Sequence, residues 1–384
     1  MSELTGTYTA YAYSDTAPTL TNIVHTEVIH RPPSKGEITL RVCATALNPM
    51  DTQLAGVSGI DKVAMNWVGG RNYRKGEDNE LAGRIPGADV SGVIVAIGEG
   101  VVRWKIGDKV FGFWLSPNGN GTNQAYLTLP ADAPLVLKPP TLTHTQAASL
   151  PLVFLTSYAG LILRGGLDRD PEVNARRGTK VLVVGASEGT GIIGVQIAKS
   201  LGAKVVAVCS GEDAEFVKDN GADEANHTSQ DISSVALSHG PYQVIYDCVG
   251  GTQLIPHLSA LLAPTPNTAD PHHPPASPGT YITIVGDKAS RTSMGGSVTY
   301  LSSPSMLFRS FKGHTGLGPK YHCVNPTTGE EEMKALAEWS ASGRIKPVID
   351  GEPWDWIKLG EAYQRLESGW ARGKVVIKWA KEEL

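Results

Sequence analysis

The stretch from Val181 to Gly194 constrains the fold more than any other part of this chain. It reads VLVVGASEGTGIIG, in which a short β-branched apolar run is followed at once by a glycine-bearing turn. The next segment, Ile192–Leu201, has the apolar spacing of a helix. A buried strand, a glycine turn and a helix in this order are the context of a dinucleotide-binding fingerprint. The sequence therefore predicts a helix N-terminus that can meet a diphosphate.

The turn departs from the G-x-G-x-x-G pattern. On that pattern Ala186 takes the first glycine position, Glu188 the second and Gly191 the third, with Gly185 and Gly189 beside the expected positions. A carboxylate repels a diphosphate, so we expect the Glu188 side chain to point away from it. A strand–helix turn without a ligand is the alternative. The candidate phosphate-binding residues are Ala186, Ser187, Glu188, Gly189, Thr190 and Gly191.

Length and composition narrow the class of protein. At 384 residues the chain suits two domains, and 41% hydrophobic and 19% charged residues with a net charge of −4 are ordinary for a globular protein. No basic run points to nucleic acid, and no apolar run looks long enough to span a bilayer. The N-terminus resembles no signal peptide and the four cysteines are scattered, so we expect a reduced, cytoplasmic protein.

The order of elements predicts a β-rich domain and an α/β domain. Short strands such as Glu37–Ala46 recur between turns before residue 150, which is typical of a barrel or sandwich. After Val181, strands alternate with helices, including a helix expected over 252–262, which predicts a doubly wound parallel sheet. The closing strand Lys374–Lys378 suggests that the chain returns to the first domain. We expect residues 1–151 and 325–384 in one domain and 152–324 in the other.

Two segments do not follow this plan. Residues 55–83 contain a Gly-Gly pair and a charged tract, which indicates a surface loop or part of a substrate cleft. Residues 263–279 carry six prolines and the pair His272-His273, which predicts an exposed loop with solvated histidines.

Several motifs together resemble the medium-chain dehydrogenase/reductase superfamily, in its zinc-free quinone-oxidoreductase and enoyl-reductase branch. They include Asn48–Asp51, Pro86–Asp89, Leu201–Ala203, Asp247–Gly251 and Gly373–Val376, in the order of that family. The likeness extends to fungal stand-alone enoyl reductases that serve polyketide synthases. The resemblance implies an α/β protein with a GroES-like β-rich catalytic domain and a Rossmann domain, a doubly wound parallel sheet that binds NADPH.

The resemblance also implies an expectation about metals. Relatives that use zinc carry a Cys where Asn48 stands, a Gly-His-Glu motif and a four-cysteine lobe, none of which this sequence has. The cysteines at 43, 209, 248 and 323 cannot form such a closely spaced set. We therefore expect no metal, and hydride transfer to an activated C=C bond with donors that meet the enolate oxygen.

The same resemblance suggests roles for individual residues. Ser210 resembles the family's 2′-phosphate ligand, which favours NADPH, and Lys218 lies one helical turn later, although a plain helix cap explains Ser210 as well. Gln53 stands where many relatives have a lysine; it can donate a hydrogen bond but carries no charge. The expected catalytic residues are Asn48, Gln53 and Thr156, and the further cofactor contacts are Val249, Gly250, Val285, Gly286 and Lys374.

The expected function is NADPH-dependent reduction of an α,β-unsaturated C=C bond in fungal polyketide or secondary metabolism. The substrate would be a small or carrier-bound polyketide-like molecule, with a polyketide synthase as a partner. Two alternatives stay open. The same fold could reduce an aldehyde or iminium, or shape a non-redox cyclisation of a bulky metabolite, which Trp67 and Tyr73 would suit. The chain could also bind a nucleotide without catalysis.

Overall fold

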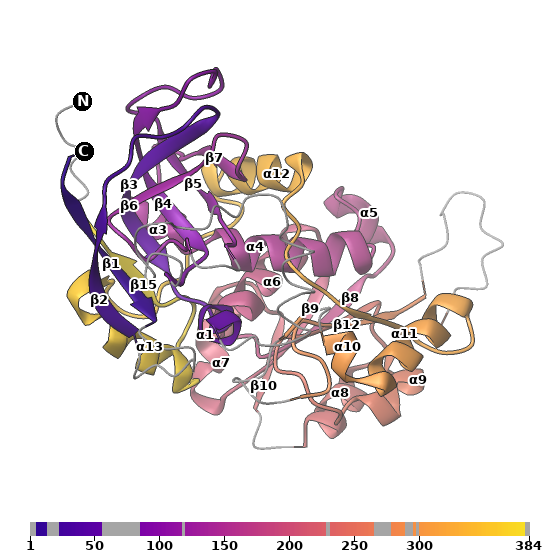
Figure 1. Ribbon diagram of the computed structural model, residues 1–384. Helices are drawn as coiled ribbons and strands as arrows, with labels where there is room; N and C mark the ends of the chain where they lie inside the picture. Colours follow the sequence, from indigo (N-terminus) through magenta and orange to yellow (C-terminus); the bar gives the residue numbers. More distant parts are fainter. Residues whose placement is uncertain are drawn as a thin grey trace. The chain divides into compact units, whose positions relative to one another are not determined.

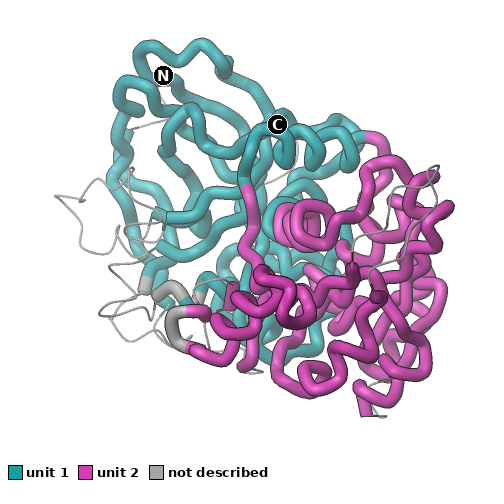
Figure 2. Tube along the Cα trace, turned by 90° about the vertical axis from the view of Figure 1, so that its right-hand side faces the viewer, with its two compact units in different colours: residues 1–152, 328–341, 347–384 teal, residues 153–327, 342–346 magenta. Residues whose placement is uncertain are grey.

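The computed structural model describes residues 5–13, 23–55, 85–116, 120–227, 231–264, 278–288, 295–296 and 299–380. The chain divides into two compact units, residues 1–152, 328–341 and 347–384, and residues 153–327 and 342–346 (Figure 2). Residues 325–327 and 342–346, which we expected in the first domain, lie in unit 2, and Leu152, which we expected in the second domain, lies in unit 1. The domain boundaries stay a prediction. Trp67, Tyr73 and the pair His272-His273 lie outside the described residues.

Unit 1 is β-rich, as the sequence predicts. Its described residues form a seven-stranded sheet in the order β14-β15-β3-β4-β5-β7, with β6 also on β3. Apolar side chains at alternate positions of the long strand β3, such as Ile38 and Leu40, are fully buried in its core. The strands are β3 (Glu37–Ala46), β4 (Asp89–Ile97), β5 (Lys109–Phe113), β6 (Tyr126–Pro130), β7 (Leu135–Leu137), β14 (Trp354–Asp355) and β15 (Val376–Lys378). A separate antiparallel pair is formed by β1 (Thr7–Tyr13) and β2 (Ile23–Ile29).

Unit 2 contains a parallel sheet of six described strands in the order β10-β9-β8-β11-β12-β13 (Figure 1). The chain order reverses between β8 and β11, and in such sheets ligands bind beyond the carboxyl ends of the strands at that point. The predicted doubly wound sheet is confirmed. Its strands are β8 (Lys180–Val184), β9 (Lys204–Cys209), β10 (Glu224–His227), β11 (Val244–Asp247), β12 (Thr280–Thr283) and β13 (Lys320–Cys323).

Helices connect these strands. The helix expected over 252–262 is wrong in extent, because only the 3-10 turn η5 (Ile255–His257) and α9 (Leu258–Leu261) are helical there. In unit 1 the helices are α1 (Pro49–Ala55), α3 (His144–Ala148), α12 (Glu330–Ala341), η6 (Trp356–Lys358) and α13 (Leu359–Glu367), and α4 (Pro151–Tyr158) leads into unit 2. In unit 2 they are η3 (Ala159–Arg164), α5 (Pro171–Arg176), α6 (Gly189–Ser200), η4 (Gly211–Asp213), α7 (Ala214–Asp219), α8 (Ile232–His239), α10 (Thr299–Ser302) and α11 (Pro304–Thr315).

One buried tyrosine joins three elements below the glycine turn. A Cβ on Gly160 or Gly194 would lie 2.7 or 2.8 Å from ring atoms of Tyr246, so both residues must be small. The Tyr246 hydroxyl donates to Ser157 Oγ at 3.3 Å, and Ser157 Oγ donates to the Thr190 carbonyl at 3.0 Å. The first turn of α6 is therefore fixed to β11 and α4.

The helical segment His144–Arg164 corrects one expectation. It is 21 residues long and apolar enough, by length and composition, to cross a membrane, which we did not expect of any segment. Of its most apolar window, 83% is buried inside the fold, as in the core helix of a folded domain.

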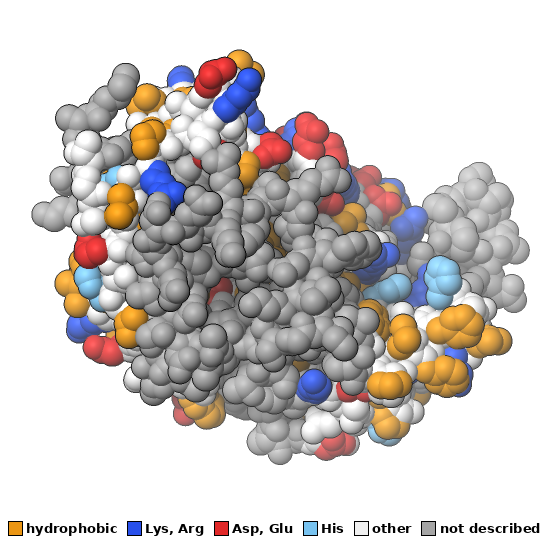
Figure 3. Space-filling model, in the orientation of Figure 1, with side chains coloured by type: hydrophobic (Ala, Val, Ile, Leu, Met, Phe, Trp, Pro, Cys, Tyr) orange, Lys and Arg blue, Asp and Glu red, His pale blue; other side chains and the backbone are white. Residues whose placement is uncertain are grey.

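The surface of α11 is apolar on one side, where Leu307, Phe308 and Phe311 are exposed (Figure 3).

Candidate active site

The glycine turn lies at the carboxyl edge of the parallel sheet in unit 2. Gly185 has φ +75°, and the backbone N–H groups of Gly185 and Ala186 donate to the Val208 carbonyl at 2.9 and 3.0 Å. A Cβ on Gly191 would lie 2.1 Å from the Gly185 carbonyl oxygen. Gly191 therefore lets α6 begin directly against the turn. The strand, turn and helix that the sequence predicts are present, with α6 beginning at Gly189 instead of Ile192.

Glu188 is the N-cap residue of α6. Its backbone is extended, at φ −79° and ψ 166°, and its side chain makes no capping hydrogen bond. Burial raises the pKa of the nearby Cys248 thiol well above its ordinary value, and the charges of Asp247 and Glu188 raise it further. The Glu188 carboxylate thus lies within electrostatic range of the end of β11. Its orientation relative to a bound diphosphate stays a prediction.

Replacement of Glu188 tests that orientation. In Glu188→Gly, NADPH affinity is expected to be equal or higher, because a negative charge near the helix N-terminus is removed. Titration calorimetry with NADPH measures the change, and Glu188→Gln separates the effect of charge from that of backbone freedom. A marked loss of affinity in both variants would show that the carboxylate has a positive role in binding.

The loops after β11 and β12 are each ordered by the last residue of the preceding strand. These residues, Asp247 and Thr283, are paired in register, so they occupy equivalent positions. Asp247 Oδ1 accepts the backbone N–H groups of the second and third residues after it, each at 2.9 Å. Thr283 Oγ1 does the same at 3.2 and 2.9 Å. The Gly251 N–H donates to the Gly286 carbonyl at 2.9 Å and joins the two loops. The structure thereby brings together the predicted contacts Val249, Gly250, Val285 and Gly286.

Sequence reasoning did not identify Asp247 and Thr283 as the residues that order these two loops. Asp247 is buried, Tyr281 donates its hydroxyl proton to Asp247 Oδ2, and burial raises the pKa of this carboxyl. A short polar side chain that ends a strand and precedes a glycine is a recognisable turn signal. That signal was available in the sequence Asp247–Gly251.

Ser210 directly follows β9, as expected for a ligand of the adenosine ribose. The Ser210 hydroxyl donates to the Asp213 carboxylate and makes no helix-capping hydrogen bond. The alternative of a plain helix cap is therefore wrong. Asp213 is buried, whereas Lys218 is exposed on α7. The contact of Ser210 or Lys218 with a 2′-phosphate stays a prediction.

In unit 1, Asn48 and Lys374 belong to one buried ion-pair network. The Lys374 ammonium donates to the Leu47 carbonyl at 2.9 Å, to Asn48 Oδ1, and to Asp89 Oδ2 at 3.0 Å. Asn48 Nδ2 donates to the same Asp89 oxygen at 3.0 Å. An ammonium has three protons, so Lys374 has its full set of acceptors within the protein. Its predicted contact with a cofactor is not tested by this arrangement.

Asp51 extends the network. Its Oδ2 accepts the Asn48 backbone N–H at 2.9 Å and the Tyr363 hydroxyl at 3.2 Å. Burial raises the pKa of the Asp51 carboxyl to about 7. The carboxyl therefore titrates near neutral pH beside Asn48.

The other two predicted catalytic residues lie on helices. Gln53 is half-buried on α1, and Thr156 is buried on α4 in unit 2. Their catalytic roles stay predictions.

The described residues contain no group of three His, Cys, Asp or Glu side chains that could hold a metal ion. The four cysteines are each buried and unpaired with another cysteine. At Asn48, the side-chain oxygen and nitrogen are already bonded to Lys374 and Asp89. The Asn48 side chain therefore does not fit a zinc ion, and the expected absence of a metal stays a prediction.

Comparisons with known proteins agree with this architecture. The family model described as "Alcohol dehydrogenase GroES-like domain" matches residues 34–140, and that described as "Zinc-binding dehydrogenase" matches residues 220–377. The mitochondrial NAD(P)H oxidoreductase RTN4IP1 of Homo sapiens is 31% identical over 352 residues, which cover 91% of this chain and 83% of that protein. The chain belongs to the medium-chain dehydrogenase/reductase superfamily.

More distant members support the same assignment. The chloroplastic NADPH-dependent alkenal/one oxidoreductase of Arabidopsis thaliana is 26% identical, over 96% of this chain and 78% of that protein. The quinone oxidoreductase of Coxiella burnetii has the same fold, with a TM-score of 0.71 and 21% identity over 97% of this chain and 99% of that chain. The chain is therefore an oxidoreductase that uses a nicotinamide cofactor, NADPH included.

The residues of unit 2 fit such a cofactor. The glycine turn and the N-terminus of α6 can receive a diphosphate, because small residues let the backbone approach it. The ordered loops after β11 and β12 supply backbone groups at the same edge of the sheet. Open parallel sheets bind dinucleotides at this edge.

Proposed function

We propose that the protein reduces a C=C bond conjugated to a carbonyl group, with NADPH as the hydride source. The observation that carries the proposal is the side-chain amide of Asn48, whose oxygen accepts from Lys374 and whose two protons are donated to the Ala46 carbonyl and to Asp89. The family resemblance implies a cysteine at this position in zinc-dependent members. An enone accepts hydride at its β-carbon and spreads the charge onto oxygen, so hydrogen-bond donors can replace a metal. The Arabidopsis relative is named an NADPH-dependent alkenal/one oxidoreductase, which supports the same choice of substrate.

The chain's own residues would bind and orient the reactants. When bound, the nicotinamide would supply a hydride to the β-carbon, and the C=C electron pair would move toward the carbonyl oxygen. Asp247 and Thr283 hold the two loops in place before the cofactor binds, so the loops lose little conformational entropy on binding. The α-carbon then takes a proton from water or from a side chain.

The choice of NADPH rests on Ser210. Its hydroxyl now donates to Asp213, and we propose that it donates to a 2′-phosphate instead when NADPH is bound, with Lys218 as a nearby cation. Ser210→Ala is expected to weaken NADPH binding about tenfold and NADH binding little, because a hydrogen bond to a charged group is lost. Parallel titrations with the two cofactors measure the ratio. An unchanged ratio would contradict the role of Ser210.

The origin of the substrate is a separate proposal. The resemblance to fungal stand-alone enoyl reductases supports a small or carrier-bound polyketide-like substrate, delivered by a polyketide synthase in the cytoplasm, within secondary metabolism. Turnover of one enoyl group on an acyl carrier protein and on a free thioester compares the two forms. A clear preference for the carrier-bound form would support the synthase as partner, and rejection of both thioesters would contradict this origin.

The reaction itself is tested with a substrate panel. Protein and NADPH are mixed with enones, enoyl thioesters, aldehydes and imines, while absorbance at the nicotinamide band is followed. The proposal expects consumption with the conjugated C=C compounds and a product heavier by two hydrogens. Consumption with aldehydes or imines alone, or a rearranged product of unchanged mass, would contradict it. Absence of any thermal stabilisation by NADPH would contradict its use as the cofactor.

A further inference from the structure

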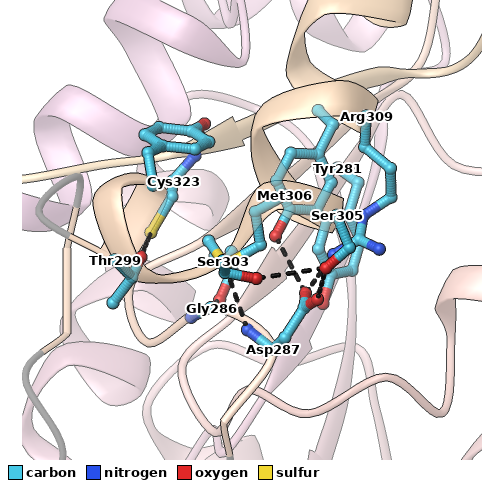
Figure 4. A network of polar contacts seen from close by, with 12 residues as sticks. Tyr281, Gly286, Asp287, Thr299, Ser303, Ser305, Met306, Arg309 and Cys323 are labelled. Carbon is cyan, nitrogen blue, oxygen red and sulfur yellow. Dashed lines mark hydrogen bonds and ion pairs between the residues drawn. The ribbon is translucent and has the colours of Figure 1, made fainter.

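Asp287 directly follows Gly286, and its carboxylate is contacted by the side chains of Ser305 and Arg309 on α11 (Figure 4). Ser305 Oγ donates to Asp287 Oδ2 at 2.9 Å, and Arg309 Nη2 donates to Oδ1. The Tyr321 hydroxyl makes a longer contact with the same Oδ1, at 3.5 Å. The loop after β12 is thus attached to α11 by an ion pair and by hydrogen bonds.

The backbone of the loop contacts the same face of α11. The Asp287 N–H points to Met306 Sδ at 3.4 Å, and a Cβ on Gly286 would lie 2.8 Å from Met306 Cε. Ser305 and Arg309 are four residues apart, so they share one helix face, with Met306 beside them. This inner face of α11 therefore sets the position of Gly286.

The loop after β11 is connected to the same arginine through two tyrosines. The Arg309 guanidinium lies 4.9 Å from the ring centroid of Tyr321. Tyr321 stacks on Tyr281 with ring centroids 5.4 Å apart and an interplanar angle of 17°. The Tyr281 hydroxyl donates to Asp247, which orders the β11 loop. Arg309 thus supports both loops at the edge of the sheet.

The ion pair is shielded from solvent. The side chains of Arg309 and Asp287 are only 22% and 16% exposed, so salt and water weaken their attraction less than at a surface pair. An ion pair of long, exposed side chains does little to fix the positions of those side chains. A shielded pair whose arginine also lies over an aromatic ring keeps both side chains in one arrangement. The Arg309–Asp287 pair can therefore fix the position of the loop after β12 relative to α11.

We propose that Arg309 and Asp287 form a latch that holds the β11 and β12 loops in the geometry that receives the nicotinamide half of the cofactor. This inference rests on the proposed function. The hydrogen bonds and ring contacts of the latch involve neither the glycine turn nor Ser210, so the latch acts on one half of the dinucleotide. Arg309 and Asp287 are positioning residues, since they act through the backbone of the two loops.

The test compares two ligands. NADPH carries the nicotinamide, whereas 2′-phospho-ADP-ribose contains only the remainder of the molecule. In Arg309→Met the Kd for NADPH is expected to rise about tenfold, as for the loss of one hydrogen bond to a charged group, while the Kd for the fragment stays within about twofold. Arg309→Lys is expected to lie between wild type and Arg309→Met, and the reversed pair Asp287→Arg/Arg309→Asp to recover part of the loss.

Lys312→Met is the matched control, because it removes a cation from the same helix at a site over the Phe308 ring. It is expected to change neither Kd. An equal rise of both Kd values in Arg309→Met, or a loss of thermal stability with both unchanged, would overturn the latch. If Arg309→Met does not fold, Arg309→Lys decides on the same ratio. Wild-type protein that binds NADPH but reduces no enone would refute the proposed function alone, since the Kd ratio still decides the latch.

Discussion

Gly191→Val is expected to reduce NADPH affinity by up to about 100-fold, the equivalent of a 1–3 kcal/mol overpacking penalty. The atoms that its Cβ would meet are all backbone: the Gly185 oxygen at 2.1 Å, the Gly185 carbon at 2.8 Å and the Ala186 Cα at 3.0 Å. Backbone cannot rotate aside as a flexible side chain does, so the turn and the start of α6 must separate. Titration calorimetry with NADPH measures the loss, and circular dichroism verifies that the variant is folded.

The control for this substitution is Gly360→Ala in α13. No heavy atom lies within 4 Å of the position that its Cβ would take. NADPH affinity is expected to stay unchanged, and stability to stay equal or rise by up to about 1 kcal/mol, because glycine is a poor helix former. Wild-type affinity in Gly191→Val would mean that the turn is not the diphosphate site.

Lys374→Met is expected to lower the free energy of unfolding by about 3–5 kcal/mol, since it leaves a buried charge without its partner. Asp89 is 0% exposed, and Lys374 donates to its Oδ2 at 3.0 Å. Among the described residues, the remaining partners of the Asp89 carboxylate are the Asn48 amide and the Leu152 N–H, at 3.0 and 2.8 Å. Chemical denaturation followed by tryptophan fluorescence measures the change.

Two further variants separate charge burial from other effects. Lys35→Met removes a lysine whose side chain is 78% exposed, and is expected to change stability by at most about 0.5 kcal/mol. Asp89→Asn/Lys374→Met removes both charges and is expected to recover a large part of the loss. Equal stability of the single and double variants would show that the ion pair does not hold the network together.

The fold was predictable because its signals are local. The β-branched run Val181–Val184 and the glycines after it identify a buried strand, a turn and a helix within fourteen residues. The helix expected over 252–262 was wrong because its apolar spacing is interrupted at Pro256, where only a 3-10 turn forms before α9. We did not predict the strand β13 or the helix α11, although the apolar residues Leu307, Phe308 and Phe311 recur in α11 at helical spacing.

The site was predictable only where its residues lie close in sequence. The loops that contain Val249, Gly250, Val285 and Gly286 were expected at the ends of strands, and the structure has them there. Lys374 and Asp89 are separated by 285 positions, so no sequence pattern could indicate their ion pair. The same holds for the latch between Asp287 and Arg309, which depends on the packing of α11.

Hydride transfer to a carbon–carbon double bond is tested most directly by the position of a deuterium label in the product. Wild-type protein is incubated with an enone substrate and NADPH deuterated at C4 of the nicotinamide on either face, and the product is analysed by nuclear magnetic resonance. We expect one of the two labelled cofactors to place deuterium on the β-carbon, with the α-hydrogen taken from water. Deuterium on the carbonyl carbon, or a product without label from both cofactors, would contradict the account.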